Sequence, residues 1–263
     1  MTTAPPGTGV HSWSPDVERS RLDTVAQWYD SARGLNRELV KWAAKRIVRR
    51  ASGTRVLELG CASGMMTEEL ARRFGRLEVV EGALRYASRA RELVPPEGRV
   101  HHCLFEEFEP SEEYDLIVMA WVLEHVADAR GLLSRAGRWL SPGGEIHVVV
   151  PNAESLHRRT GLQMGMLDRL GDLNESDLAI GHRRVYTWQT LTADIEAAGL
   201  RLANMEGILL KPLPSEMMET LPYGLRAAFF ELASLAPRLC SEIYAVCKRG
   251  DNGGTAHPTD GLR

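Results

Sequence analysis

Short apolar runs alternate with helical patterns from residue 54 onward, and this alternation constrains the fold more than any other feature of the chain. Strands are predicted at 54–59, 77–81, 99–103, 115–120 and 145–150, and helices between them at 65–74, 83–93 and 128–140. The turn "SPGG" at 141–144 is predicted to end the last of these helices. Such alternation is typical of an α/β protein, in which helices cover both faces of a parallel sheet and the connections are right-handed.

The segments before this region are predicted to be helical. Apolar residues at helical spacing predict two helices within 15–50, which would form a cap at the N-terminal side of the domain. The two ends of the chain, 1–14 and 250–263, are rich in Gly, Pro and Thr and are predicted to be disordered.

The C-terminal part of the chain predicts one more helix and two more strands. The helix is expected at 187–198, where Thr187 is suited to cap the first turn, and the strand-like runs lie at 200–210 and 241–248. The connection 211–240 is too long for a simple hairpin. It is predicted to contain a helix near 223–236 and to act as a cap or as a subunit contact.

The composition excludes several classes of protein. The chain has 263 residues and a formal net charge of -3, which argues against a nucleic-acid-binding protein. No apolar run reaches the length of a membrane span and the start lacks the features of a signal peptide, so a cytoplasmic protein without a membrane partner is predicted. The four cysteines form no CxxC pair, and no metal site is predicted.

The stretch "VLELGCASG" at 56–64 ends the first predicted strand of the sheet in a loop of small residues. Glu81 follows Gly60 by 21 residues and ends the next predicted strand, a distance at which a carboxylate can accept hydrogen bonds from both hydroxyls of a ribose. A dinucleotide-binding loop needs a third glycine at the start of the helix, where this chain has Met65 and Met66. The pattern favours a nucleoside ligand without phosphates, although a tight strand-to-helix turn alone would also explain the loop.

Four motifs in order, "VLELGCASG", "VVEGA", "EEYDLIVMAWVLEHV" and "LSPGGEIHVVVPN", resemble those of class I S-adenosylmethionine-dependent methyltransferases. The resemblance runs from about 52 to 248, and "VLEHV" followed by "PGG" is similar to the ubiquinone-type and natural-product branch. It implies a Rossmann-like, doubly wound sheet of seven mostly parallel strands in the order 3-2-1-4-5-7-6, with the last strand antiparallel. The implied methyltransferase domain covers 51–249.

The same resemblance implies which residues bind the cofactor S-adenosylmethionine and its product S-adenosylhomocysteine. Glu58 would position the loop, Glu81 would hold the ribose, and Phe105 would flank the adenine or else belong to the core. The full implied set is Tyr29, Glu58, Gly60, Cys61, Ala62, Gly64, Glu81, Gly82, Leu104, Phe105, Glu106, Ala120 and Trp121. Ala62 stands where the family usually has glycine, and it is expected to be tolerated with a negative φ.

Three residues on the acceptor side are candidates for a catalytic base: His125, His182 and Tyr186. The alternative for His125 is that it caps or packs beneath the loop that carries it. Segment 152–186 is predicted to cover the carboxyl end of the sheet and close the site. Its arginine pairs, at 158–159 and 183–184, suggest an anionic acceptor or else surface ion pairs.

These features together predict an enzyme that transfers a methyl group to a small-molecule acceptor, at oxygen or nitrogen. The acceptor could be anionic or a natural product. The alternatives are an NAD-type or nucleotide-sugar enzyme on a similar fold, and a binding module without catalysis. The sequence predicts no nucleic-acid partner and leaves a homodimer open.

Overall fold

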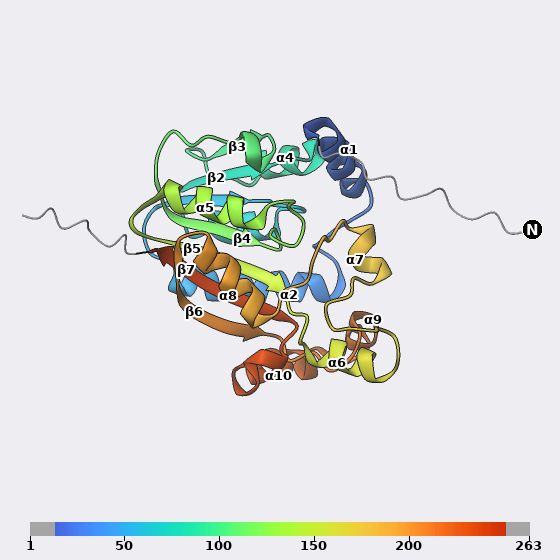
Figure 1. The fold of residues 1–263 in the computed structure, drawn as a ribbon. Coiled ribbons are helices and arrows are strands. Elements are labelled where there is room, and N and C mark those ends of the chain that lie inside the picture. The colour runs from blue at the N-terminus through green and yellow to red at the C-terminus, as the bar shows by residue number, and fades with distance from the viewer. Residues whose placement is uncertain (1–13, 251–263) are drawn as a thin grey trace, which may run out of the picture.

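The computed structural model describes residues 14–250 and contains a seven-stranded sheet in the order β3-β2-β1-β4-β5-β7-β6 (Figure 1). The strands are β1 (Arg55–Leu59), β2 (Arg76–Glu81), β3 (Arg99–His102), β4 (Tyr114–Ala120), β5 (Leu140–Pro151), β6 (Leu200–Ile208) and β7 (Glu242–Arg249). β7 runs antiparallel to both β5 and β6, and the other pairs are parallel. The predicted fold class and strand order are therefore confirmed.

Helices cover both faces of the sheet, as the alternating pattern predicts (Figure 1). They are α1 (Pro15–Ala26), α2 (Gly34–Arg50), α3 (Met65–Ala71), α4 (Leu84–Arg91), α5 (Ala129–Trp139), α6 (Leu156–Gln163), α7 (Glu175–Ala179), α8 (Trp188–Ala197), α9 (Ser215–Glu219) and α10 (Tyr223–Glu231). The predicted Thr187 cap is present, because its hydroxyl accepts from the amide of Thr190. Within residues 14–250, no helix has the length and apolarity that crossing a bilayer requires.

The central strands are buried on both faces because their residues are apolar in unbroken runs rather than in alternation. Leu57 and Leu59 of β1 belong with Ile117 of β4 to one hydrophobic cluster, whereas Val56 of β1 and Leu116 of β4 belong to the other. One cluster lies on each side of the sheet. This arrangement leaves the carboxyl ends of the strands free to build a site.

The predicted turn at 141–144 is not a separate loop, and this prediction is wrong. β5 begins at Leu140 directly after α5, and residues 141–144 lie within its bounds as an irregular stretch. The pairing with β4 shifts register there, between Tyr114 and Leu116. Gly144 approaches β4 so closely that a Cβ would lie 2.9 Å from the carbonyl oxygen of Tyr114, which explains the small residue at this point.

The connection between β6 and β7 contains the predicted helix, which ends at Glu231 and continues as 3-10 turns at Leu232–Leu235 and Pro237–Leu239. It packs against α2. The Phe230 ring stacks on the Trp42 ring at 4.8 Å between centroids. The role of the connection 211–240 as a cap or subunit contact stays a prediction. The ends predicted to be disordered, 1–14 and 250–263, lie almost wholly outside the described residues.

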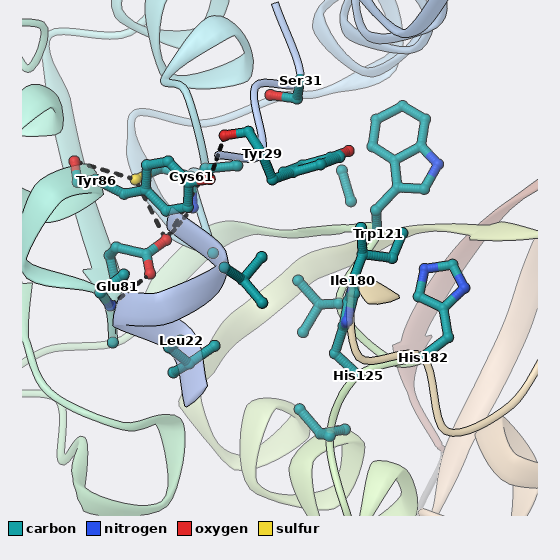
Figure 2. Close-up of a pocket in the computed structure, with 18 of the residues that line it drawn as sticks. Leu22, Tyr29, Ser31, Cys61, Glu81, Tyr86, Trp121, His125, Ile180 and His182 are labelled. Atoms are coloured by element: carbon teal, nitrogen blue, oxygen red, sulfur yellow. Dashed lines mark hydrogen bonds between the residues drawn. The ribbon is translucent and has the colours of Figure 1, made fainter. Parts of the chain in front are cut away.

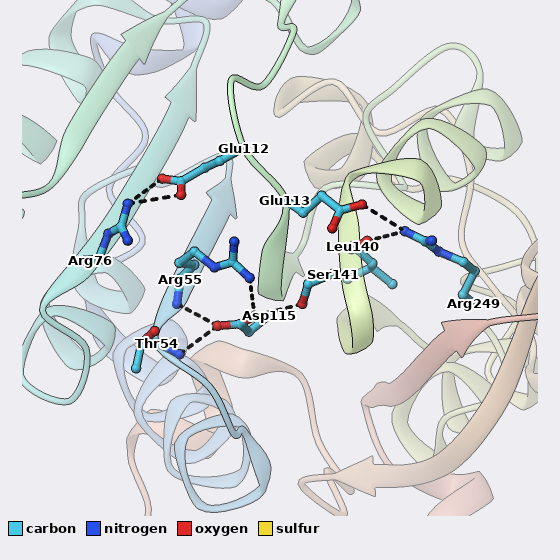
Figure 3. A network of polar contacts seen from close by, with 9 residues as sticks. All are labelled: Thr54, Arg55, Arg76, Glu112, Glu113, Asp115, Leu140, Ser141 and Arg249. Carbon is cyan, nitrogen blue, oxygen red and sulfur yellow. Dashed lines mark hydrogen bonds and ion pairs between the residues drawn. The ribbon is translucent and has the colours of Figure 1, made fainter.

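A polar network around Asp115 joins the amino ends of the central strands, opposite the site (Figure 3). The Asp115 carboxylate accepts from the amides of Thr54 and Arg55, from the Arg55 guanidinium at 3.0 Å, and from the Ser141 hydroxyl at 2.7 Å. Burial alone would raise the pKa of Asp115, but these hydrogen bonds hold it well below the ordinary range.

We expect Asp115→Ala to lower the free energy of unfolding by about 2–3 kcal/mol, because it leaves several donors without their charged acceptor. The pKa of Asp115 is lower in the folded state than in the unfolded chain, where it lies near the ordinary carboxyl value of ~4. Asp115 therefore stabilises the fold fully above about pH 4, and this stabilisation declines as the pH falls below that value. Urea unfolding at neutral and acid pH measures both effects. The exposed Asp168→Asn serves as the control, and equal loss in both variants would contradict the assignment.

Candidate functional site

A cavity of about 310 Å³ opens at the carboxyl ends of β1, β2 and β4 and is closed on one side by α1 (Figure 2). Most of the residues implied by the resemblance line it: Tyr29, Gly60, Cys61, Ala62, Glu81, Gly82, Leu104, Phe105, Glu106, Ala120 and Trp121. They come from five separate segments of the chain. The volume lies at the lower end of the range for small-molecule sites.

Glu81 organises the loop after β1 (Figure 2). Its Oε2 accepts from the amides of Cys61 at 3.0 Å and Ala62 at 3.3 Å, and its Oε1 accepts from the amide of Ala83 at 2.8 Å. Burial raises the pKa of Glu81, and these hydrogen bonds oppose the rise. A carboxylate on the cavity wall beside exposed loop backbone fits a nucleoside, because both its oxygens can also accept from ribose hydroxyls.

Ala62 adopts a left-handed conformation with φ 43°, so the expected negative φ is wrong. The hydrogen bond from its amide to Glu81 holds the loop in the conformation that a glycine would adopt. A non-glycine residue in this region costs roughly 1 kcal/mol. The loop therefore carries strain at the cavity wall.

We expect Ala62→Gly to keep the fold and to raise the free energy of unfolding by up to ~1 kcal/mol, because glycine removes the penalty for positive φ. Part of the gain is offset by the greater freedom of glycine in the unfolded chain. Thermal unfolding of the two proteins measures the difference. A clear loss of stability would show that the Ala62 methyl makes packing contacts worth more than the strain.

Two of the implied cofactor residues do not line the cavity. Glu58 is buried beneath the loop, where its Oε2 accepts from the Thr67 hydroxyl at 2.7 Å. Its Oε1 has no hydrogen-bond partner within residues 14–250. Burial raises the pKa of Glu58 to about 8. Gly64 has φ 82° and precedes α3, and a Cβ there would meet Leu93 at 2.4 Å. Both residues shape the loop from behind, so the geometry supports their positioning role and not direct contact.

The far end of the cavity is formed by Trp121, Tyr29 and Glu242. Trp121 has φ 57°, and its indole Nε1–H donates to Glu242 Oε2 at 2.9 Å. Burial raises the pKa of Glu242 to about 7, although the bond from Trp121 opposes the rise. Burial, Glu124 and Glu242 together raise the pKa of Tyr29 to about 12, so its hydroxyl stays protonated at neutral pH.

His125 and His182 also line this end, with ring centroids 4.7 Å apart (Figure 2). Burial and the neighbouring His182 lower the pKa of His125 to about 3, so this imidazole is neutral at physiological pH and a weak base. The Nδ1 of His182 lies 3.1 Å from the Asp177 carboxylate, which leaves Nε2 for a substrate. The position of its ring beside Asp177 makes His182 the candidate proton acceptor of the two.

Glu124 lies behind the two histidines. It is fully buried, and neither carboxylate oxygen has a hydrogen-bond partner among the described residues. Burial raises the pKa of Glu124 well above its ordinary value. Single donor atoms of Glu124, His125 and His182 lie within 4.8 Å of one another, a spacing that could hold a cation, although no metal site is predicted from the sequence.

Tyr186 does not line the cavity. Its ring is buried in the core and its hydroxyl donates to Asp194 at 3.2 Å, so the structure does not place it with the other two candidate bases. Burial raises its pKa above the range in which a phenol acts as a base at neutral pH. The fixed position of Tyr186 instead helps to anchor the segment before α8, through its backbone bonds to Pro151 and Ala153.

The four arginines that suggested an anionic acceptor are engaged elsewhere, and none lines the cavity. Arg184 donates to the carbonyl oxygens of Leu123, Val126 and Ala127, and Arg183 donates to that of His125. Arg158 donates to backbone carbonyls of segment 152–186 and Arg159 to that of Glu154. They brace the backbone around the site, so the suggestion of an anionic acceptor is not supported by the geometry.

Segment 152–186 contributes only Ile180 and His182 to the cavity wall, and α1 contributes Glu18, Arg21, Leu22 and Val25. The segment does pack beside α1, because a Cβ on Gly181 would meet the Arg21 guanidinium at 2.0 Å. Its role as an acceptor-side cover stays a prediction. Two functional candidates that the sequence did not single out are Glu242, a lone acid at the start of an apolar strand, and Asp177, five residues before His182.

Comparison with known proteins gives matches in sequence and in fold. Residues 28–204 match a family model described as "Methyltransferase domain". The chain is 26% identical over 174 residues to the human mitochondrial ubiquinone biosynthesis O-methyltransferase, covering 61% of this chain and 45% of that protein. It is 33% identical over 129 residues to nodulation protein S of Sinorhizobium fredii, covering 47% and 59%. The chain thus spans about half the length of these two relatives.

Among solved structures, the fold is similar to the N-methyltransferase NodS of Bradyrhizobium japonicum in complex with S-adenosyl-L-homocysteine. The TM-score is 0.57 at 18% identity, and the match covers 89% of this chain and 97% of that one. At this identity the likeness concerns the fold alone.

Proposed function

The chain belongs to the methyltransferase domain family, whose class I members use S-adenosylmethionine, and we propose that it transfers a methyl group to a small-molecule acceptor at oxygen or nitrogen. One observation carries the proposal. A single cavity joins the Gly60–Ala62 loop and Glu81 at one end to Trp121, His125 and His182 at the other. A nucleoside site thus opens directly onto a group of candidate acceptor-binding residues.

Each residue's proposed role follows from its place in the cavity. Glu81 holds the ribose of the nucleoside, the Gly60–Ala62 loop packs beside it, and Leu104 and Phe105 flank its base. When bound, S-adenosylmethionine supplies a methyl group already activated by its sulfonium. Trp121 and Tyr29 wall the space beside that methyl and exclude water, so that acceptor and methyl carbon are held in line. The Nε2 of His182 can take the proton that the acceptor loses, while Asp177 holds the ring.

The alternative of an NAD-type enzyme is disfavoured by the same loop. Gly64 is followed by Met65 and Met66 in α3, and Met66 is buried, so the helix start offers no third glycine for a pyrophosphate. A natural-product acceptor, a cytoplasmic location and a homodimer stay predictions from the sequence.

Titration calorimetry tests the proposal. We expect S-adenosylhomocysteine to bind with one site per chain, because the described residues form one loop–carboxylate pair of this kind. NAD is the matched control, since it shares the adenosine but adds a pyrophosphate. Binding of NAD without binding of S-adenosylhomocysteine would contradict the proposal.

A further inference from the structure

The acceptor end of the cavity contains a buried carboxyl group, that of Glu242, which does not bind the cofactor loop. Glu242 begins β7, is 7% exposed, and lines the cavity beside Trp121. We propose that Glu242 binds the ammonium group of an amine acceptor, so that the reaction is N-methylation. This inference rests on the proposed function and specifies its substrate class.

The other charged side chains of the cavity wall have partners or belong to the nucleoside end of the cavity. Arg21 pairs with Glu18 at 2.5 Å, Glu81 holds the loop, and Glu106 lies with the segment expected at the adenine. No other lysine or arginine among the described residues lines the cavity. The acceptor end is thus left with one carboxyl group, that of Glu242, and no free positive group.

Lys211 is the cation that acts on Glu242 from outside the cavity. It is buried, and its Nζ donates to the Ser215 hydroxyl at 2.8 Å. Burial lowers the pKa of Lys211, and the attraction to Glu242 opposes this change. No ion pair within 4.0 Å joins Lys211 and Glu242, so the carboxylate remains open to a cation from the cavity side.

The walls around Glu242 also suit an ammonium group. Trp121 and Tyr29 are aromatic, and an alkylammonium group is attracted to such rings as well as to a carboxylate. The left-handed backbone of Trp121 orients its indole toward Glu242, and strain of this kind is typical of functional sites. The remaining walls, which include Leu22, Val126 and Ile180, would accommodate an apolar body.

An acceptor of another charge fits less well. A carboxylate acceptor would place a like charge beside Glu242, and a neutral alcohol would bring no positive charge to the cavity side of this carboxylate. An ammonium group supplies that partner in the substrate and again in the product.

The proton and bond changes balance. The bound ammonium gives one proton to His182 Nε2 and becomes a neutral amine. Its nitrogen lone pair then forms the N–C bond to the methyl carbon as the C–S bond breaks, and the sulfur leaves as a neutral thioether. The product is a methylated ammonium, which Glu242 holds until it dissociates.

The test uses matched probes that share an apolar body and differ in the head group: phenethylamine, 2-phenylethanol and 3-phenylpropionate, with the same three head groups on a cyclohexyl body. Binding to the full chain saturated with S-adenosylhomocysteine is measured by ligand-observed NMR and calorimetry. We expect the amine of at least one series to bind tenfold or more tightly than its two partners. Equal binding within both series, or preference for the alcohol or the acid, would overturn the proposal.

Variants assign the preference to Glu242. Glu242→Gln should abolish the preference for the amine probe, while its affinity for S-adenosylhomocysteine stays within threefold of the wild type. The substitution Glu109→Gln, at an exposed position, should leave the preference unchanged. If Glu242→Gln does not fold, Glu242→Asp should lower the preference without abolishing it. If Glu242→Gln still prefers the amine probe, the assignment to Glu242 is overturned. The assignment is also overturned if EDTA removes the preference for the amine and added Zn²⁺ restores it. Failure of S-adenosylhomocysteine itself to bind would instead overturn the proposed function.

Discussion

Replacing Glu81 by alanine is expected to weaken binding of S-adenosylhomocysteine by about 10- to 150-fold, or roughly 1.5–3 kcal/mol, the range for lost hydrogen bonds to a charged group. In the structure the Glu81 carboxylate accepts from the amides of Cys61, Ala62 and Ala83. The substitution therefore removes the acceptor for the ribose and also releases the loop that shapes the nucleoside site. The fold should persist, because Glu81 lies at the end of β2.

Calorimetry at several pH values measures this effect. Because burial raises the pKa of Glu81, the wild-type affinity should fall as the pH drops through that pKa and the carboxylate becomes protonated. Glu81→Ala should lack this dependence. Glu92→Ala, at an exposed position just after α4, is the control. An unchanged dissociation constant at Glu81→Ala would show that the ribose is held elsewhere.

The sheet and the nucleoside side of the cavity could be predicted from the sequence because their signals are local. The apolar runs marked six of the seven strands of the described sheet to within two residues at each end, whereas β5 begins five residues before its predicted start. The spacing from Gly60 to Glu81 placed two loops at neighbouring strand ends, and the structure joins them through a hydrogen bond of 3.0 Å between Glu81 and the Cys61 amide. Both facts depend on residues within one strand–helix–strand unit.

The acceptor side was predicted less well because its contacts join distant parts of the chain. Glu242 lies 121 residues after Trp121, and no spacing rule indicates that pair. The arginine pair at 183–184 resembled a binding site for an anion, yet its partners are carbonyl oxygens 57 to 61 residues earlier. A guanidinium donates equally well to a backbone oxygen or to a ligand, so sequence alone does not separate these roles.

Tyr186 and Ala62 show two further limits. Tyr186 was chosen for its residue type within a polar cluster, whereas its ring is buried against the core and its hydroxyl is bound to Asp194. At Ala62 the expected negative φ followed from the methyl group alone. The loop instead adopts the left-handed conformation, because hydrogen bonds from its amides to Glu81 offset the steric cost.

Replacing His182 by alanine is expected to lower turnover by about 10²- to 10⁴-fold, the usual contribution of a general base, with the affinity for S-adenosylhomocysteine unchanged. His182 lies on the cavity wall, and its Nδ1 faces the Asp177 carboxylate, so that Nε2 carries the free lone pair. His125 is less suited, because its pKa is lowered to about 3. Turnover is measured by mass spectrometry as S-adenosylhomocysteine formed with the amine probes.

Companion variants separate a catalytic role for His182 from a structural one. Asp177→Asn keeps the size of the side chain but removes the charged partner of His182 Nδ1. Turnover should therefore fall, but less than at His182→Ala. Tyr186→Phe should keep turnover near the wild-type level, since its hydroxyl contacts Asp194 and not the cavity. Full activity at His182→Ala would mean that positioning by Trp121 and Glu242 suffices, with the proton leaving to solvent.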